Sequence, residues 1–392
     1  MDMKMPIRFG VIGVGTMGYA HADYLRNSKV DGAVLAALCD QNLGRLEELK
    51  NIFPNVPCFL DSDELLKSGL CDAVIIATPH YDHSLIGIRA FECGLHILSE
   101  KPMAVQLSEA YAFAKAADQS GKAFCVMFNQ RTNPVFAKAR ELVQSGFLGE
   151  LKRINWIITN WYRTQHYYDS GDWRASWSGE GGGVLMNQAP HNLDLLQWIC
   201  GMPKRIMAKC DVGKYHQIEV EDEALLIGEY ENGATLLFHT STGEFPGTNR
   251  LEIAGDRGKI VMEKGILKFW RLHESERSFC FSSKKSFDKI SMEYEEMRFN
   301  VKGSAHGKIL QNFVDHIISD EPLISDGRDA INEVVLSNAA YLSSWEDEWI
   351  NLPGDSSLFD SYLQQLKQSS TKRNFEKEFK NEGYQERWQV RW

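Results

Sequence analysis

The sequence predicts an α/β protein: an N-terminal doubly wound parallel sheet of Rossmann type, followed by a second, α+β domain with a large, mainly antiparallel open sheet. Up to about residue 125, continuous apolar runs alternate with helical segments, as in strands buried on both faces. From about residue 150, strand-like segments of mixed alternation are separated by Gly-containing turns, which is typical of an antiparallel sheet with one covered face. A chain of 392 residues accommodates two such domains.

The first strand and the turn after it form a nucleotide-binding pattern. The first apolar run leads directly into Gly13, Gly15 and Gly18, and a helical segment follows. The first glycine permits a tight turn, the second lets the backbone approach a pyrophosphate, and the third lets helix and strand pack closely. Free N–H groups at the helix N-terminus favour phosphate. We therefore expect a dinucleotide to bind at Gly13, Gly15, Thr16, Met17 and Gly18.

An acidic residue at the end of the second strand-like run narrows the choice of dinucleotide. Asp40 follows Gly18 by 22 residues, where a carboxylate contacts the adenosine ribose. A carboxylate accepts hydrogen bonds from the ribose hydroxyls and repels a 2′-phosphate, so the sequence favours NAD over NADP. Nearby Arg45 weakens this preference. The alternative interpretation is a glycine-rich surface turn followed by an ordinary strand-end Asp.

Further polar residues follow the later strands of the first sheet. Thr78 and Pro79 close the fourth strand, and Glu100 and Lys101 close the fifth. Asn129 follows the sixth. Because ligands of such sheets bind at the carboxyl ends of the strands, we expect these residues to line the crevice.

Composition limits the classes of function. The formal net charge of −10 argues against a general nucleic-acid-binding protein. No run approaches the roughly 20 apolar residues of a membrane span, and the N-terminus shows no signal-peptide pattern, so we expect a cytoplasmic protein with no membrane partner. The 8 cysteines include no CxxC pair, which favours buried free thiols over disulfides or a metal site.

Three regions are expected along the chain. Residues 1–127 form the dinucleotide-binding domain. Residues 128–354 form the substrate-binding domain, with helices over about 187–199, 305–319 and 327–349, the last two of which return to the first domain. The charged segment 355–392 contains several aromatic residues, which predicts a tail docked on this chain or on a neighbouring subunit.

Three longer segments resemble the Gfo/Idh/MocA oxidoreductase family, and the likeness runs to about residue 350. They are GVIGVGTMG near the start, ATPHYDHSLIGIRAFECGLHILSEKP through the fourth and fifth strands, and WRASWSGEGGGVLMNQAPHNLDLLQW in the second domain. The resemblance implies a nicotinamide cofactor in the first domain and a polyol, sugar or cyclitol against the open sheet of the second. It also implies hydride transfer at one carbinol carbon.

The resemblance assigns roles to individual residues. It implies that Lys101 is the catalytic lysine and His191 the catalytic histidine. Either group can take the hydroxyl proton as the carbon loses hydride, provided that its pKa lies near neutrality. The alternatives are a salt bridge of Lys101 to Glu100 and a core hydrogen bond of His191. His83 and Asn129 match family positions beside the cofactor or active site.

Aromatic rings and cations are mixed in the segment before the triple glycine. Flat apolar rings and convergent donors suit a carbohydrate face, so we expect Arg163 and Tyr168 to bind substrate. Trp173 and Arg174 match the family's WR pair and are expected at the cofactor. The alternative for any one of them is aromatic core or a solvated arginine.

One position departs from the family pattern. The family often has Asp four residues before the histidine, where this chain has Asn187. An amide cannot act as a general base, so we expect Asn187 to bind a substrate hydroxyl while His191 and Lys101 exchange the proton. Asn187, His191 and Asp194 share one face if they lie on one helix, and we expect Asp194 to orient the imidazole or hold a hydroxyl. A zinc site at His191 and Asp194 lacks a third ligand nearby.

These observations predict an NAD-dependent dehydrogenase acting on a secondary hydroxyl of a sugar, glycoside or cyclitol, with a glycoside or hexose favoured over free inositol. A redox-neutral NAD-dependent glycoside hydrolase, acting through a keto-sugar intermediate and elimination, is the alternative. A non-catalytic NAD-binding regulator would have lost Lys101 or His191, and both are present. We also expect a homo-oligomer formed through the second-domain sheet.

Overall fold

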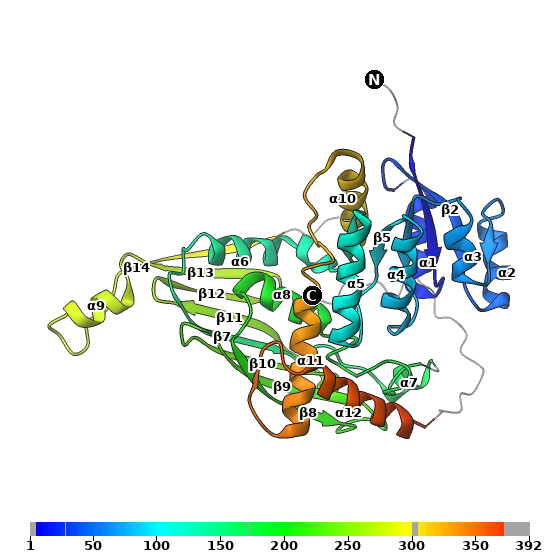
Figure 1. Ribbon diagram of the computed structural model, residues 1–392. Helices are drawn as coiled ribbons and strands as arrows, with labels where there is room; N and C mark the ends of the chain where they lie inside the picture. The colour runs from blue at the N-terminus through cyan, green and yellow to red at the C-terminus, as the bar shows by residue number, and fades with distance from the viewer. Residues whose placement is uncertain (1–4, 28, 172, 300–304, 372–392) are drawn as a thin grey trace.

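The first domain of the computed structural model is built on a parallel sheet (Figure 1). The structure describes residues 5–27, 29–171, 173–299 and 305–371. The sheet has six strands in the order β3-β2-β1-β4-β5-β6. This order reverses between β1 and β4, which places a ligand crevice at the carboxyl ends of these strands. The strands are β1 (Ile7–Ile12), β2 (Ala33–Cys39), β3 (Cys58–Phe59), β4 (Ala73–Ile76), β5 (His96–Ser99) and β6 (Phe124–Val126).

Helices connect these strands on both faces of the sheet, as the alternating pattern predicted. Two apolar clusters form, one on each face, because the buried apolar side chains of the strands alternate between the two faces. The connecting helices are α1 (Thr16–Arg26), α2 (Leu43–Ile52), α3 (Ser62–Lys67), α4 (Asp82–Glu92) and α5 (Leu107–Ser120). The predicted doubly wound fold is confirmed.

The second domain is built on a nine-stranded sheet in the order β14-β13-β12-β11-β7-β10-β9-β8-β15. The pairing of β10 with β7 is parallel and the other pairings are antiparallel, which confirms the predicted sheet type. The strands are β7 (Leu151–Ile158), β8 (Arg205–Val212), β9 (Glu221–Glu229), β10 (Thr235–Ser241), β11 (Asn249–Gly255), β12 (Gly258–Glu263), β13 (Ile266–Leu272), β14 (Met292–Arg298) and β15 (Ile350–Asn351).

Helices cover one face of this sheet and leave the other open (Figure 1). Along β7 and β9, buried residues alternate with more exposed ones, because every second side chain points into the core. Trp156 and Phe238 from the covered face are fully buried. The covering elements include α6 (Pro134–Gln144), α8 (Pro190–Cys200) and α11 (Ile331–Glu346).

Two C-terminal helices join the domains, as predicted. Helix α10 (Ala305–Ser319) packs on the first sheet, where the rings of Phe313 and Phe9 lie 6.2 Å apart. Helix α11 contributes Val334 to a core cluster of the first domain and Leu336 to the core of the second. Both sides of the crevice are therefore held by one short stretch of chain.

The helix that follows the triple glycine begins later than expected. We predicted it from residue 187, but α8 begins at Pro190, where a fixed φ and the missing N–H suit a first turn. The structure also contains elements that the sequence did not predict. They include the 3-10 turn η1 (Asn129–Thr132), α6, α7 (Gln165–Asp169), α9 (Glu276–Ser282), α12 (Ser356–Ser369), β14 and β15.

The tail begins with a docked helix. In α12 (Ser356–Ser369), Phe359 and Leu363 are fully buried, and the Phe359 ring stacks on Trp345 at 5.5 Å. The remaining tail aromatics on which the docking prediction was based lie outside the described residues: Phe375, Phe379, Tyr384, Trp388 and Trp392.

Candidate active site

The glycine motif forms a cradle between β1 and α1. At Gly13, with φ at +82°, an added Cβ would lie 2.7 Å from the Ala77 carbonyl group, and at Gly18 it would lie 1.9 Å from the Gly13 oxygen. At Gly15 it would meet nothing within 4 Å. Thr16 follows as the first residue of α1, and no side chain caps this helix start. Open space beside uncapped N–H groups fits a pyrophosphate.

Two buried polar atoms near the crevice have no hydrogen-bond partner among the described residues. They are Oγ1 of Thr78, at the end of β4, and Oδ1 of Asn129, in η1. Buried polar atoms are almost always satisfied by protein, water or ligand. The cradle and these two atoms are suited to a dinucleotide with its phosphate, ribose and amide groups, so the residues present fit NAD. Pro79 lies beside Thr78 and is exposed.

Asp40 lies at the end of β2 and is tied to the glycine loop. Its carboxylate accepts hydrogen bonds from the backbone N–H groups of Val14 and Asn42, each at 2.9 Å. Nη1 of Arg45 also lies 2.9 Å from Oδ2 of Asp40. Arg45, which weakened the sequence-based preference for NAD, is therefore paired with the Asp40 carboxylate.

We expect Asp40→Ala to weaken NAD binding and to relax discrimination against NADP. The change removes the acceptor for the ribose hydroxyls and frees Arg45, which can then pair with a 2′-phosphate. A shift in the ratio of the two dissociation constants of about tenfold or more is expected, since 1.4 kcal/mol corresponds to a factor of ten. Titration of NADH and NADPH fluorescence measures both constants. An unchanged ratio would mean that another group reads the ribose.

Lys101 reaches from the first domain to the second. It follows β5, and its Nζ donates to the backbone oxygen of Asn187 at 2.7 Å. Burial lowers the pKa of Lys101, although the carboxylates of Glu100 and Glu333 act in the opposite direction. The salt bridge to Glu100 that we considered as the alternative is not formed among the described residues, and Nζ contacts the second domain instead. A lysine with a lowered pKa can exist in the neutral form that accepts a proton.

His191 lies in the first turn of α8, near Lys101. Burial lowers its pKa well below the usual value, and the positive charge of Lys101 lowers it further. Its Nδ1 is buried without a hydrogen-bond partner, and its ring packs edge-on against Phe128 at 6.0 Å. The imidazole is therefore neutral, and the core hydrogen bond considered as the alternative is not made by Nδ1.

Glu100 and His83 support the loop around Lys101 from behind. Oε1 of Glu100 pairs with Nε2 of His21 on α1 at 2.8 Å. Burial would raise the pKa of Glu100, but the hydrogen bond and charge of His21 lower it to about 2. The ring nitrogens of His83 face the backbone oxygens of Pro102 and Thr78 at 2.7 and 2.9 Å. Both side chains are nearly fully buried and support this loop, and their predicted contacts with the cofactor stay predictions.

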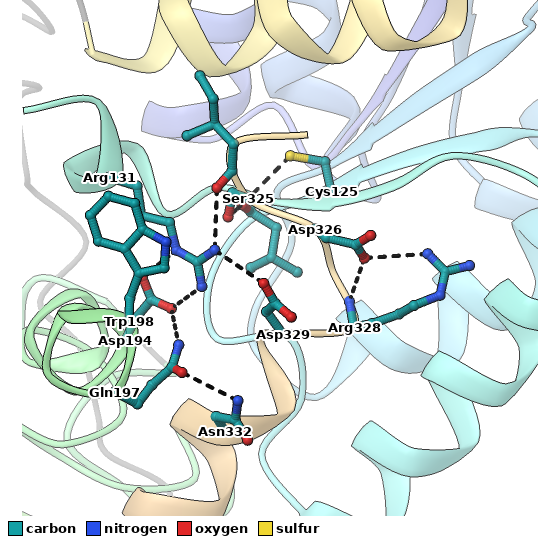
Figure 2. Close-up of polar contacts among 12 residues, drawn as sticks. Cys125, Arg131, Asp194, Gln197, Trp198, Ser325, Asp326, Arg328, Asp329 and Asn332 are labelled. Atoms are coloured by element: carbon teal, nitrogen blue, oxygen red, sulfur yellow. Dashed lines mark hydrogen bonds and ion pairs between the residues drawn. The ribbon is translucent and has the colours of Figure 1, made fainter. Parts of the chain in front are cut away.

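Asp194 does not orient the imidazole as we predicted. Its carboxylate forms two hydrogen bonds with Arg131 at 2.6 and 2.9 Å, and both side chains are 1% exposed (Figure 2). The prediction assumed that Asn187 shares a helix face with His191 and Asp194, but Asn187 precedes α8. The pair instead joins η1 to α8 inside the protein.

The aromatic segment places a different tyrosine in the site from the one we predicted. Tyr168 is 1% exposed and its hydroxyl bonds to Thr242 at 2.7 Å, so it belongs to the core. Its neighbour Tyr167 accepts a hydrogen bond from Nη1 of Arg174 at 2.6 Å and lies 3.4 Å from Nδ2 of Asn187. The Arg163 guanidinium packs over the Tyr167 ring at 5.0 Å and donates to two backbone oxygens of its own loop.

Trp173 and Arg174 lie across the crevice from the end of β4. The Trp173 ring is 5.2 Å from the ring of His80, which follows Pro79, and the Arg174 guanidinium packs over Trp173 at 4.5 Å. His80 is buried and its Nδ1 lies 2.8 Å from the backbone oxygen of Glu180. We did not single out His80 or Glu180 from the sequence. The proximity of His80 to the predicted Thr78–Pro79 strand end was the available signal.

The triple glycine is held by a buried carboxyl group. Glu221, on β9, accepts hydrogen bonds from the backbone N–H groups of Gly183 and Leu185 and from the Tyr341 hydroxyl at 2.8 to 2.9 Å. A Cβ at Gly183 would lie 1.9 Å from the Glu221 backbone oxygen. Close packing and three donors thus fix the start of the loop that carries Asn187.

We expect Glu221 to make stability depend on pH. Burial raises its pKa from 4.5 to about 7 despite the three donors. The folded protein therefore binds a proton that the unfolded chain releases, so this contribution to stability is complete below about pH 4.5 and is lost as pH rises through 7. Urea unfolding from pH 4 to 8 should show this decline in the wild type and a flatter profile in Glu221→Gln. Parallel profiles would contradict the assignment.

Family models match both domains. Residues 7–128 match the NAD-binding Rossmann fold of the Gfo/Idh/MocA oxidoreductase family, and residues 136–261 match the family's C-terminal domain. The chain is a member of the Gfo/Idh/MocA family. Its N-terminal domain is therefore an NAD-binding domain and the protein an oxidoreductase, as the sequence motifs predicted.

Relatives within the Gfo/Idh/MocA family include named dehydrogenases. The scyllo-inositol 2-dehydrogenase (NAD(+)) of Bacillus subtilis is 29% identical over 66% of this chain and 75% of its own. The scyllo-inositol 2-dehydrogenase (NADP(+)) IolW of the same organism is 28% identical over 50% of this chain and 54% of its own. The WlbA dehydrogenase of Bordetella pertussis, crystallised with NADH and UDP-GlcNAcA, has a TM-score of 0.75 and 26% identity, covering 89% of this chain and 100% of its own.

Among the described residues, no helix is both long and apolar enough to cross a membrane. Within the same part of the chain, no group of three or more His, Cys, Asp and Glu side chains is placed to hold a metal ion.

Proposed function

We propose that this protein is an NAD-dependent dehydrogenase that transfers a hydride between a secondary hydroxyl of a sugar, glycoside or cyclitol and the nicotinamide. The observation that carries the proposal is the position of Lys101. Its Nζ bridges from the end of β5 to Asn187, beside the neutral imidazole of His191. A neutral imidazole and a lysine whose pKa is lowered by burial thus meet where the NAD-binding domain faces the second domain, which suits proton transfer in alcohol oxidation.

The residues of the chain supply the proton chemistry of this reaction. NAD, when bound, supplies the acceptor for the hydride that leaves the carbinol carbon. Neutral Lys101 takes the hydroxyl proton at Nζ, and burial favours its neutral form. His191, whose imidazole is neutral and lies near Lys101, offers a second base. In the reverse direction, protonated Lys101 returns the proton to the oxygen of the carbonyl group as hydride adds to carbon.

A substrate screen tests the proposal. NADH absorbance at 340 nm would be followed with purified protein, NAD and a panel of hexoses, glycosides and inositols. The aromatic segment favours hexoses and glycosides as substrates. The panel also includes inositols, because the two Bacillus subtilis relatives are named for scyllo-inositol. NADH formation with at least one member supports the proposal. Its absence across the panel, in a protein that binds NAD, would contradict it.

The redox-neutral glycoside hydrolase remains distinguishable in the same assay. It would release the aglycone without net NADH, whereas a dehydrogenase forms NADH in proportion to product. The relatives reported above are named as dehydrogenases, and nothing in the comparisons supports the hydrolase. Chromogenic glycosides in the panel report aglycone release directly.

We propose that the enzyme is cytoplasmic. We also propose that its subunits contact one another through the open face of the nine-stranded sheet. Leu225 and Ile227, on β9, are 37% and 45% exposed there. Adjacent exposed apolar side chains on a broad sheet are typical of an interface. Light scattering should give a mass above that of the monomer, and Ile227→Glu should lower it. A monomeric wild type would contradict this placement.

A further inference from the structure

Glu180 is a buried acid in the candidate active site that the mechanism above does not use. Its side chain is 1% exposed, and it lies directly before the triple glycine. Its Oε2 accepts a hydrogen bond from the backbone N–H of Ala175 at 2.7 Å, and its Oε1 lies 4.0 Å from Nη1 of Arg174. Oε1 also accepts a hydrogen bond from Nδ2 of Asn187. A carboxyl group in such surroundings is held in one place.

Asn187 connects this acid to the catalytic lysine. Its backbone oxygen accepts the hydrogen bond from Lys101, and its side-chain nitrogen donates to Glu180 and, at 3.4 Å, to the Tyr167 hydroxyl. An amide nitrogen carries two hydrogens, so both are engaged within the protein. The amide oxygen is then the side-chain atom of Asn187 that can accept a hydrogen bond from a ligand.

We infer that Glu180 is a positioning residue that fixes the orientation of the Asn187 amide, so that residue 187 accepts a hydrogen bond from a substrate hydroxyl. The inference rests on the proposed dehydrogenase function. A free asparagine amide can turn by 180° and exchange donor for acceptor. A carboxylate beside it excludes one of these orientations, because two acceptor oxygens would then face each other. The substrate therefore meets an acceptor on the same residue whose backbone oxygen holds Lys101.

Exchange of the carboxyl group at residue 180 with the amide at residue 187 tests this inference. Glu180→Gln removes the group that dictates the orientation, and we expect kcat/KM to fall about 10- to 100-fold, the size of a hydrogen bond to a charged group. Asn187→Asp places two buried carboxyl groups in contact and should lower kcat/KM by a similar factor. The double variant Glu180→Gln with Asn187→Asp restores one donor and one acceptor, with the acceptor at residue 187. We expect it to recover most of the wild-type kcat/KM.

Unfolding of the same four proteins in urea distinguishes catalysis from folding. Recovery of kcat/KM in the double variant supports the inference. Additive losses, or a Glu180→Gln variant with wild-type kcat/KM, would overturn it. Coupling between the two positions in stability but not in kcat/KM would show that the pair only holds the loop, and would also overturn it. If the wild type forms no NADH with any substrate, the proposed function fails together with this inference, whereas additive losses in an active enzyme reject the inference alone.

Discussion

Replacement of Lys101 by methionine is expected to lower NADH formation by about 10²- to 10⁴-fold, the range for loss of a general acid–base group. Methionine keeps the length of the side chain but cannot accept the hydroxyl proton. NAD binding should persist, because the glycine cradle and Asp40 lie at the other end of the dinucleotide site. Fluorescence titration of NADH measures binding, and absorbance at 340 nm measures turnover.

Two further variants make this test specific. Lys101→Arg keeps a cation that does not lose its proton in the working pH range, so it should be as inactive as the methionine variant. Lys115→Met, on the exposed side of α5, is the matched control and should retain wild-type activity. If Lys101→Arg oxidises substrate at the wild-type rate, Lys101 is not the base.

The pH dependence of the wild type follows from the same group. Oxidation needs neutral Lys101, so its rate should rise with pH as the lysine loses its proton. Reduction needs the protonated form and should fall over the same interval. Because burial lowers the pKa of Lys101, this change should lie below the usual range of a lysine.

The sequence predicted those parts of the molecule in which local pattern and local geometry coincide. The glycine loop is one such part, because a Cβ at Gly18 would clash with the Gly13 oxygen of the same turn, although Gly13 itself is confined by Ala77 beyond the end of β4. Strand ends are another, so Lys101 could be placed in the crevice without knowledge of the second domain. The Rossmann sheet followed from the alternation of apolar runs with helical segments.

The second half of the site depends on the residue at which each helix begins, and the spacing of residues in the sequence does not give that position. Asn187 and Asp194 were expected on one helix face, but α8 begins between them at Pro190. Tyr167 and Tyr168 are adjacent, and only the start of α7 decides which of them faces the site. Glu180 contacts Asn187 through a turn of the glycine-rich loop, a contact that no helical or strand period indicates.

A second large effect is expected at the buried ion pair that replaced our predicted Asp194–His191 contact. We expect Arg131→Met to lower the free energy of unfolding by about 3–5 kcal/mol, because the change leaves Asp194 as an uncompensated buried charge. Arg131 also donates to the backbone oxygen of Ile324 at 3.2 Å, in the segment that leads into α11. Urea unfolding at pH 7 measures the loss.

A surface pair of the same geometry provides the control. Arg8 and Asp72 also form two side-chain hydrogen bonds, at 3.0 and 2.8 Å, but their side chains are 45% and 39% exposed. Water screens these charges and solvates whichever partner remains, so Arg8→Met should cause a small fraction of the loss seen with Arg131→Met. Equal losses for the two variants would contradict the argument from burial.

Removal of both buried charges distinguishes two contributions to the free energy of unfolding: the destabilisation by an unpaired buried carboxylate and the stabilisation by the ion pair itself. Burial raises the pKa of Asp194 and Arg131 acts against this, so Arg131→Met should make the carboxyl group protonate more readily. The variant should then recover stability as pH falls from 7 to 5, since the neutral acid costs less to bury. A double variant, Arg131→Met with Asp194→Leu, should unfold nearer to the wild type than Arg131→Met alone, because no charge remains unpaired. If the double variant is the least stable of the three, the pair itself holds η1 against α8, and the desolvated carboxylate is not the main cost.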